Sequence, residues 1–394
     1  MKLVELFFGN IVYFISLFVP KRKNVWIFGS KGGDSYSDNP KYVFEYINKN
    51  QPEIKTVWLT KNKIVLEHLR TIGVRVYYIN SIKGIIWQMM AKVAIISHGI
   101  SDINKYACGR LKIVECWHGV PMKPVLLSDP KEEALKKREN IRRLSFVLPY
   151  LRKRINYKEY FVICGSGDRS NKILKKVFGD NSNLISSGFP RLDGLFVENN
   201  YSISICREVD ELKSQGKQIG IYMPTYRREG EFDIVDYFYK NIKEINNHLQ
   251  RNNQSLFVKI HSFEKNLKEK KNIGNVFFIS NSEIKDDIYS ILNKFDFLIT
   301  DYSSIVFDFL ILSRPVFFLT PDRESYIKSN GNFVFDYLDL NFDVFLTWDD
   351  FFSEVNFEKE LSHSNKYKEA GMKFHAYIDG NNSERVVEYI NSNL

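Results

Sequence analysis

The stretch FLITDYSSIVFDFL, residues 297–310, decides the fold class of this chain. Its first four residues, Phe297–Thr300, have the length and the mostly apolar character of a strand that is buried on both faces. Asp301 ends this run, and a pair of serines then opens an apolar segment that suits a helix. A strand that leads directly into a helix is the repeating unit of a parallel sheet covered by helices. The stretch therefore predicts an α/β fold.

The same alternation of apolar runs and helix-length stretches extends to both sides of this segment. Runs rich in β-branched and aromatic residues indicate strands, and their spacing leaves room for a helix between most of them. The expected strands are 24–29, 56–59, 74–78, 93–97, 113–116, 161–164 and 184–187 in a first series, and 219–223, 256–260, 276–279, 297–300 and 316–319 in a second. The two series predict two Rossmann-like domains, residues 23–197 and 198–394, whose parallel sheets face each other across a ligand cleft.

Composition and charge narrow the classes of function. A chain of 394 residues, of which 44% are hydrophobic, can bury two domain cores. The net charge of +9 favours an anionic partner, with general solubility as the alternative. The four cysteines show no CxxC spacing, so we expect a reducing compartment and neither a disulfide framework nor a zinc site. The glycine-rich loop Gly29–Pro40 lacks the spacing of a dinucleotide fingerprint or of an NTPase phosphate loop, which excludes both classes.

Two segments indicate contact with a membrane. Residues 3–20 form a mostly apolar run that is short for a bilayer span, carries a carboxylate, and is followed by the basic residues Lys21–Lys23. We expect residues 1–22 to form an interfacial helix on an anionic membrane surface, and the alternative is a helix that docks on the protein itself. Residues 129–160 are dense in lysine and arginine and predict a basic amphipathic insertion in the first domain, with a solvated helix face as the alternative.

Polar motifs are expected where the strands end, because ligands of open parallel sheets bind beyond the carboxyl ends of the strands. The motif WHGVPMK, residues 117–123, follows the strand expected at 113–116. The glycine and the proline of this motif fix the backbone, so the histidine side chain is presented in a set direction. An imidazole with an ordinary pKa of about 6.5 can accept a proton at neutral pH. His118 is therefore a candidate general base, and a structural histidine is the alternative.

The second domain offers groups that suit anionic oxygens. The motif PTYRR, residues 224–228, follows the strand expected at 219–223 and supplies hydroxyl and guanidinium groups. Lys259 and His261 lie on the same face of the next strand by its period of two, which indicates phosphate ligands. A surface lysine beside a structural histidine is the alternative for this pair.

Further polar groups surround the serine pair of the opening stretch. Ser303 and Ser304 begin a helix whose free N–H groups predict an anion site. Asp308, four residues after the second serine, is expected on the same helix face, where it could accept hydrogen bonds from sugar or polyol hydroxyls. An N-capped core helix is the alternative. The turn SGFPRLD, residues 187–193, places Arg191 near the junction of the two domains.

These motifs together resemble those of the CDP-glycerol glycerophosphotransferases, a family of teichoic-acid primases and polymerases and their capsule-polymer relatives. WHGVPMK, SGFPRLD, YMPTYR, KIH and DIYSILNKFDFLITDYSSIVFDF occur in the family's order over roughly residues 24–380, and SYSDNPKYVFEY is similar to the family's opening. The resemblance implies a GT-B fold and a peripheral enzyme on the cytoplasmic face of the cell membrane. It also implies a donor, CDP-glycerol or a related CDP-alditol such as CDP-ribitol, and a lipid-linked saccharide or polymer as the acceptor.

The resemblance also implies roles for individual residues. His118 and His261 would be the essential catalytic pair. The resemblance and the motifs together give a set of candidate substrate ligands: Trp117, Gly119, Val120, Pro121, Arg191, Pro224, Thr225, Arg227, Lys259, Ile260, Ser303, Ser304 and Asp308. The hypothesis is an in-line displacement at the phosphorus that bears the alditol, with CMP leaving. Helix N–H groups and cations take the place of a metal and no cofactor is expected; a divalent ion held by nearby aspartates is the alternative.

Two other functions compete with this hypothesis. A GT-B glycosyltransferase that uses a nucleotide sugar would share the fold, and a donor panel separates it from an alditol phosphotransferase. A basic module that binds nucleic acid or a membrane surface without catalysis would instead show salt-sensitive binding. We expect no nucleic-acid partner, because the aromatic residues lie in strands and the basic residues cluster in one helical region.

Overall fold

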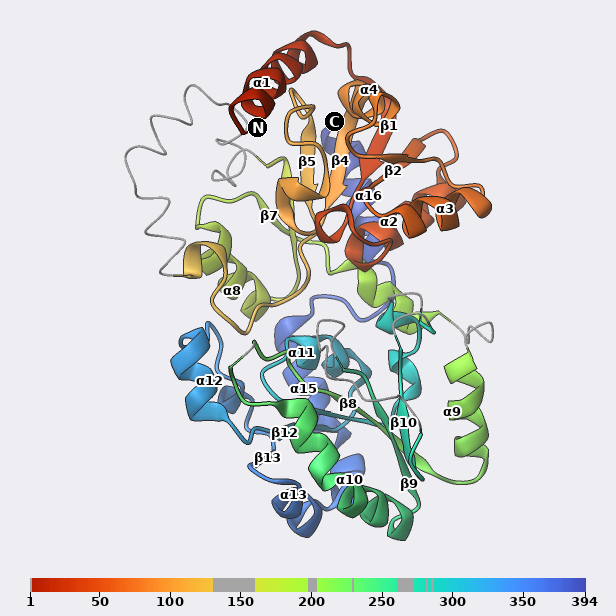
Figure 1. Cartoon of the computed structure of the whole chain (residues 1–394), viewed down its shortest axis with the longest axis vertical. Helices are drawn as coiled ribbons and strands as arrows, with labels where there is room; N and C mark the ends of the chain where they lie inside the picture. The colour runs from red at the N-terminus through yellow and green to blue at the C-terminus, as the bar shows by residue number, and fades with distance from the viewer. Residues whose placement is uncertain are drawn as a thin grey trace. The chain divides into compact units, whose positions relative to one another are not determined.

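The computed structural model describes residues 2–129, 160–197, 204–228, 230–260, 272–280, 283–284 and 287–394. It divides into two compact units, the first comprising residues 1–118, 126–194 and 379–394, and the second 119–125 and 195–378 (Figure 1). This division differs from the predicted domains, because residues 119–125 group with the second unit and the C-terminal residues 379–394 with the first. The predicted basic insertion, except for its two end residues, lies outside the described residues.

The first unit is built on a seven-stranded sheet in which every strand pairing is parallel. Its order is β3-β2-β1-β4-β5-β6-β7, so the direction of winding reverses between β1 and β4. The strands are β1 (Arg22–Phe28), β2 (Lys55–Thr60), β3 (Val76–Tyr78), β4 (Ala91–Ile96), β5 (Lys112–Glu115), β6 (Val162–Gly165) and β7 (Leu184–Ser186).

The second unit repeats this plan with six parallel strands in the order β10-β9-β8-β11-β12-β13. The strands are β8 (Gln218–Met223), β9 (Gln254–Val258), β10 (Val276–Phe278), β11 (Phe297–Thr300), β12 (Val316–Leu319) and β13 (Val344–Phe345). The winding reverses between β8 and β11. The predicted α/β fold with parallel sheets is therefore confirmed. The edge strand β13 was not predicted, because its two residues are too few to give a sequence pattern.

Helices flank both sheets. In the first unit they are α1 (Lys2–Phe18), α2 (Asp38–Asn50), α3 (Lys63–Thr71), α4 (Ile82–Met90), α8 (Asp168–Phe178) and α16 (Asn382–Asn393), with 3-10 turns η1 (Lys31–Gly33), η2 (Gly99–Asp102) and η3 (Leu126–Ser128). The turn η5 (Pro190–Phe196) begins in the first unit and ends in the second. In the second they are α9 (Ser204–Ser214), α10 (Ile234–Arg251), α11 (Ile305–Phe309), α12 (Arg323–Asn330), α13 (Trp348–Glu354), α14 (Phe357–Ser362) and α15 (Ser364–Phe374), with η6 (Ile288–Ser290), η7 (Leu292–Lys294), η8 (Leu310–Leu312) and η9 (Tyr337–Leu340).

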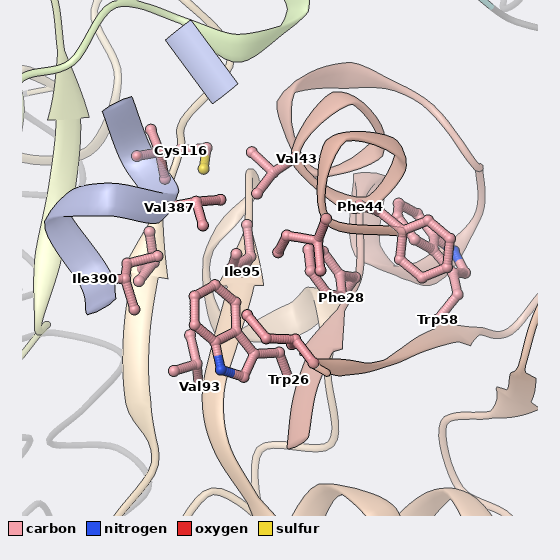
Figure 2. Packing of buried hydrophobic residues seen from close by; sticks show 14 of the residues in the cluster. Trp26, Phe28, Val43, Phe44, Trp58, Val93, Ile95, Cys116, Val387 and Ile390 are labelled. Atoms are coloured by element: carbon pink, nitrogen blue, oxygen red, sulfur yellow. The ribbon is translucent and has the colours of Figure 1, made fainter. Parts of the chain in front are cut away.

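The core of the first unit explains why the end of the chain belongs to it. Val387 of α16 is buried in one cluster with Val43 of α2 and with Trp26 and Phe28 of β1 (Figure 2). Burying each side chain of this size contributes about 1.5–3 kcal/mol, so α16 is held by its apolar face. The first turn of this helix is also capped from within the unit, because the Asp193 carboxylate accepts hydrogen bonds from the first two backbone N–H groups of α16.

Helix α1 presents two different faces. Its inner face docks on the loop that follows η2, where the Ser16 hydroxyl accepts a hydrogen bond from the backbone N–H of Gly109 at 2.9 Å and Tyr13 is buried. Its outer face is apolar and exposed, and it comprises Phe8, Ile11, Phe14, Ile15 and Phe18. No helix in the described part of the chain combines the length and the hydropathy that crossing a bilayer requires.

Candidate functional site

The reversal points of the two sheets identify where ligands are expected. In doubly wound sheets, ligands bind beyond the carboxyl ends of the strands that flank the reversal, because the two connecting loops leave in opposite directions there. In the first unit these strands are β1 and β4, and in the second unit they are β8 and β11. Most of the predicted site residues follow these strands or their neighbours in the sheet.

His118 follows β5 in the first unit and has a fixed tautomer. Its Nδ1 lies 3.1 Å from the backbone carbonyl oxygen of Ser97. A carbonyl oxygen only accepts, so Nδ1 carries the proton and the lone pair is on Nε2. Burial lowers the pKa of His118 below its ordinary value, and the Asp38 carboxylate and the Ser97 carbonyl oppose this only in part. His118 is therefore a neutral imidazole with a basic Nε2, as a general base requires.

Trp117 orients the loop that carries this histidine. Its ring is buried, packs edge-on against Phe178 and lies against the His118 ring, with 3.8 Å between the ring centroids. The Asn39 side-chain amide donates to the Trp117 carbonyl oxygen at 2.7 Å, which ties the loop to the start of α2. Trp117 itself has a positive φ of 55°. The predicted substrate ligand Trp117 thus has its side chain in the core, where it supports His118.

Arg191 is held by a carboxylate that the sequence analysis did not select. Its guanidinium forms an ion pair with Asp38 at 3.1 Å, and both side chains are at most 7% exposed. Burial alone would raise the pKa of Asp38, but Arg191, the imidazoles of His98 and His118, and Lys31 hold that pKa below its usual value. Asp38 also has a φ of 64°, which is uncommon outside glycine. A charged pair and two imidazoles therefore gather near the reversal point of the first sheet.

His98 is the second residue that the sequence analysis missed. It lies two residues after the end of β4, and its ring is stacked on that of His118 with 4.3 Å between centroids and 13° between planes. The motif Ser97-His98-Gly99 sits at the end of a strand that was predicted, so position alone could have found it. Asp38 is likewise the first residue of α2, within the segment that resembles the family's opening.

The motif WHGVPMK is shared between the units. His118 is the last residue of its segment in the first unit, and Gly119, with a φ of 96°, begins a segment of the second. Val120 is buried, and Pro121 is buried beside it. The backbone carbonyl of Met122 accepts a hydrogen bond from Val334 at 2.9 Å, which anchors this segment within the second unit. The predicted ligands Gly119, Val120 and Pro121 therefore offer mainly backbone groups.

In the second unit, Arg227 is engaged by carboxylates. Its Nε and Nη2 donate to the two oxygens of Asp322 at 2.8 and 2.9 Å, and Nη2 also donates to Asp301 at 2.9 Å. The guanidinium is 3% exposed and lies over the rings of Tyr302 and Tyr326. This geometry favours a role in holding the loop after β8 over direct contact with a substrate.

Pro224 and Thr225 begin that loop. Both residues are buried, and the backbone N–H of Thr225 donates to Asp301 at 2.8 Å across the reversal point between β8 and β11. The Thr225 hydroxyl has no hydrogen-bond partner among the described residues. A buried hydroxyl without a partner is costly, which is consistent with a ligand that completes its bonding.

The serine pair follows β11 as predicted. Ser303 and Ser304 are half-buried, and the Ser303 hydroxyl accepts a hydrogen bond from the Ile305 N–H at 3.5 Å. The predicted helix is present as α11, which has only five residues and continues as the 3-10 turn η8, so its dipole is weak. Asp308 is 1% exposed and accepts a hydrogen bond from the Tyr289 hydroxyl at 2.6 Å. That contact places the Asp308 carboxylate inside the unit.

The last predicted motif follows β9. Lys259 is half-buried, and its ammonium group donates to the carbonyl oxygen of Ile260, a buried residue, at 3.3 Å. His261, the second predicted catalytic histidine, lies outside the described residues. Among the residues that the structure describes, no three His, Cys, Asp or Glu side chains are placed to hold a metal ion.

Two Rossmann-like units with cations, hydroxyls and a histidine beyond their strand ends define a doubly wound α/β protein. A family comparison is more specific. The profile of the CDP-glycerol:poly(glycerophosphate) glycerophosphotransferases matches residues 11–392. The chain belongs to this family, which confirms the family predicted from the motifs.

Curated relatives carry the names of teichoic acid enzymes. The chain is 28% identical over 343 residues to the teichoic acid poly(glycerol phosphate) polymerase of Bacillus subtilis, covering 85% of this chain and 44% of that protein. It is 27% identical to the polymerase of the same name from Bacillus spizizenii, covering 83% of this chain and 82% of that one. A teichoic acid ribitol-phosphate polymerase of Staphylococcus aureus, TarL, is 28% identical over 59% of this chain and 42% of its own length. The chain thus spans less than half of the Bacillus subtilis polymerase.

Solved structures support the fold. The wall teichoic acid polymerase TagF superposes with a TM-score of 0.73 at 22% identity, covering 99% of this chain and 95% of that one. A Staphylococcus aureus MnaA–UDP structure superposes with a TM-score of 0.54 at 14% identity, covering 94% and 96% of the two chains. At these identities the likeness concerns the fold alone.

Proposed function

We propose that the protein transfers an alditol phosphate from CDP-glycerol, or a related CDP-alditol, to a hydroxyl group of a teichoic acid or capsule-polymer acceptor, releasing CMP. The observation that carries this proposal is the tautomer of His118, whose Nδ1 is bound to the Ser97 carbonyl and whose Nε2 is free to accept a proton. Family membership supplies the reaction class, and the name of the family supplies CDP-glycerol as the donor.

The reaction is an exchange of one P–O bond for another. The acceptor hydroxyl gives its proton to Nε2 of His118 while its oxygen bonds to the phosphorus that bears the alditol. The bond from that phosphorus to the bridging oxygen breaks, and CMP leaves with this oxygen. Phosphoryl transfer depends chiefly on positioning and on stabilising charge, so the remaining site residues act as ligands of the donor.

Residues of the second unit supply these ligands in the proposal. The hydroxyls of Thr225, Ser303 and Ser304 and the ammonium group of Lys259 are the groups that suit the diphosphate. The Thr225 hydroxyl is buried without a partner among the described residues, and both serines are only half-buried. His261 keeps the role of second essential histidine that the family resemblance implies. A TagF variant has been soaked with CDPG, so the donor is available as a probe.

A donor panel tests the proposal. Purified protein is incubated with a lipid-linked acceptor and with CDP-glycerol, CDP-ribitol or a series of UDP-sugars, and released CMP or UDP is quantified. We expect CMP release from a CDP-alditol and a product whose mass has increased by whole alditol-phosphate units. UDP release from a sugar donor, with no CMP from any CDP-alditol, would establish a glycosyltransferase instead.

His118 is tested in the same assay. The His118→Ala variant should lose about two to four orders of magnitude in turnover, which is the usual contribution of a general base. Replacing His248, a histidine of α10 stacked on Phe352, provides a control that removes an imidazole elsewhere. A near-wild-type rate for His118→Ala would remove the assignment of the base.

We also propose that the enzyme works at the cytoplasmic face of the membrane as a peripheral protein. The apolar outer face of α1 remains exposed while its inner face docks on the protein, and the exposed basic residues Arg22 and Lys23 follow the helix. An apolar face beside basic residues suits the interface of an anionic bilayer. The acceptor in this proposal is carried on a lipid, which brings it to the same surface.

A further inference from the structure

We propose that His98 is a positioning residue for His118, whose ring it stacks against and holds in the orientation that general-base catalysis needs. This inference rests on the proposed role of His118 and goes beyond it by adding a residue outside the WHGVPMK motif. The two rings are nearly parallel, at 13°, with 4.3 Å between their centroids. Trp117 lies near His118 as well, with its ring tilted by 35°. The imidazole of His118 is thus placed by two aromatic neighbours.

One residue binds both rings. The Ser97 carbonyl oxygen lies 3.1 Å from Nδ1 of His118, and the Ser97 hydroxyl lies 2.9 Å from Nδ1 of His98. The same hydroxyl lies 3.1 Å from that of Ser30, at the end of β1. Both histidines are therefore tied through Ser97 to the ends of β1 and β4, the strands that flank the reversal point of the sheet.

The turn that carries His98 is fixed by buried carboxylates. Asp102 accepts hydrogen bonds from the backbone N–H groups of Ser97 and His98, each at 2.8 Å, and from Gly32 at 2.6 Å. Glu115 accepts a hydrogen bond from the Gly99 N–H at 2.9 Å. With its backbone held at these points, His98 cannot move away from His118 unless the turn is broken.

Burial is the main cause that lowers the pKa of both rings, and the nearby charges act in both directions. Burial, followed by the charge of His118, lowers the pKa of His98 to about 3. The charged groups that act on the pair come from several elements: Lys31 of η1, Asp38 at the start of α2, and Arg191 of η5. Asp102 of η2 and Glu115 of β5 bind the turn, and burial raises the pKa of each carboxyl. A positive charge on both stacked imidazoles is disfavoured at this distance, because like charges repel each other.

Removing His98 should therefore change His118 in a specific way. The His98→Ala variant opens one face of the His118 ring to water, which relieves the burial that lowers the pKa of His118. We expect this pKa to rise towards its ordinary value of about 6.5. The acidic limb of the pH profile of kcat/KM should move to higher pH by the same amount. The value of kcat should fall about ten-fold because the base is less well placed. The KM for CDP-glycerol should stay within about two-fold, since His98 has no part in the proposed donor ligands.

The experiment combines two readouts on the full-length protein. Imidazole NMR signals of His118, assigned by their loss in His118→Gln, are titrated in wild type, His98→Ala, His98→Phe and His248→Ala without any substrate. The same four proteins are assayed with CDP-glycerol over a range of pH. His98→Phe loses the bond to Ser97 but keeps a flat ring that can stack on His118. Because the stacking is retained, we expect most of the wild-type titration and rate to remain.

The outcomes separate this inference from the proposed function. A raised His118 pKa and lowered kcat in His98→Ala, restored in His98→Phe and absent in His248→Ala, supports the positioning role. Titration and kinetics of His98→Ala that match wild type would overturn it. An equal loss in His98→Phe and His98→Ala would overturn the stacking argument. If wild type transfers nothing from any donor while the titrations behave as expected, the proposed function fails and the coupling of the two rings stands.

Discussion

Replacing Arg227 by alanine tests whether this arginine holds the loop after β8 or binds a substrate. The side chain connects three segments, because it bonds to Asp322 and Asp301, which lie 95 and 74 residues away in sequence. Both carboxylates are at most 3% exposed in these ion pairs. Arg227→Ala therefore leaves two buried carboxylates without their cation.

The expected cost follows from this burial. Removing one partner of a buried ion pair costs about 3–5 kcal/mol, because the remaining charge keeps its desolvation penalty. That is a large share of the total stability of about 5–15 kcal/mol that is usual for a folded protein. The adjacent Arg228 is exposed, and Arg228→Ala removes the same charge from the same loop at a cost of about 0.5 kcal/mol or less.

Hydrogen exchange read by mass spectrometry suits this measurement, because the chain has two compact units and global unfolding need not be two-state. Peptides that cover β8, β11 and β12 report on the second unit, and peptides of β1 and β4 serve as an internal reference. We expect faster exchange in Arg227→Ala, confined to the second unit, and no such change in Arg228→Ala. Hydrogen exchange in Arg227→Ala that is as slow as in the wild type, together with a large rise in the KM for the donor, would refute the reasoning. Arg227 would then be a substrate ligand.

Three further predictions follow from the first unit. Gly188 and Gly73 have the same φ of 78°, but a Cβ added at Gly188 would meet the first residue of α16, whereas a Cβ at Gly73 would meet open space. Gly188→Ala should therefore lower the melting temperature clearly more than Gly73→Ala, and equal losses would exclude the clash. Asp38→Asn removes a carboxylate that raises the pKa of His118, so the acidic limb of kcat/KM should move to lower pH, and a move to higher pH would contradict this. Phe18→Ser, at a side chain that is 76% exposed on α1, should weaken co-sedimentation with anionic vesicles about ten-fold or more, and unchanged binding would exclude α1 as the membrane contact.

Local pattern was enough to predict most strands and the place of most motifs. The strands predicted at 297–300 and 316–319 match β11 and β12. Each is a short apolar run, and the polar or turn residues on either side of the run mark where the strand begins and ends. The same pattern put His118, Thr225 and the serine pair beyond strand ends, where the structure has them. It could not fix the length of α11, since its apolar spacing continues into the 3-10 turn η8.

The neighbours of each motif were decided by strand order. His98 and His118 are twenty positions apart in the printed sequence and stack because β4 and β5 are adjacent in the sheet. Arg191 meets Asp38 from more than 150 residues away. A period of apolar residues records which face of an element is buried, but it carries no information about which strand lies beside which.

The sequence by itself determined the α/β class, the family and the strand ends at which chemistry is expected. Only the tertiary structure decided that Arg227 is saturated by two carboxylates, that α16 returns to the first unit, and that a second imidazole supports His118. The physical reason is the same in each case. Burial and pairing depend on contacts between segments distant in the chain. Those contacts are set by the order of the strands in each sheet, which the crossover connections determine.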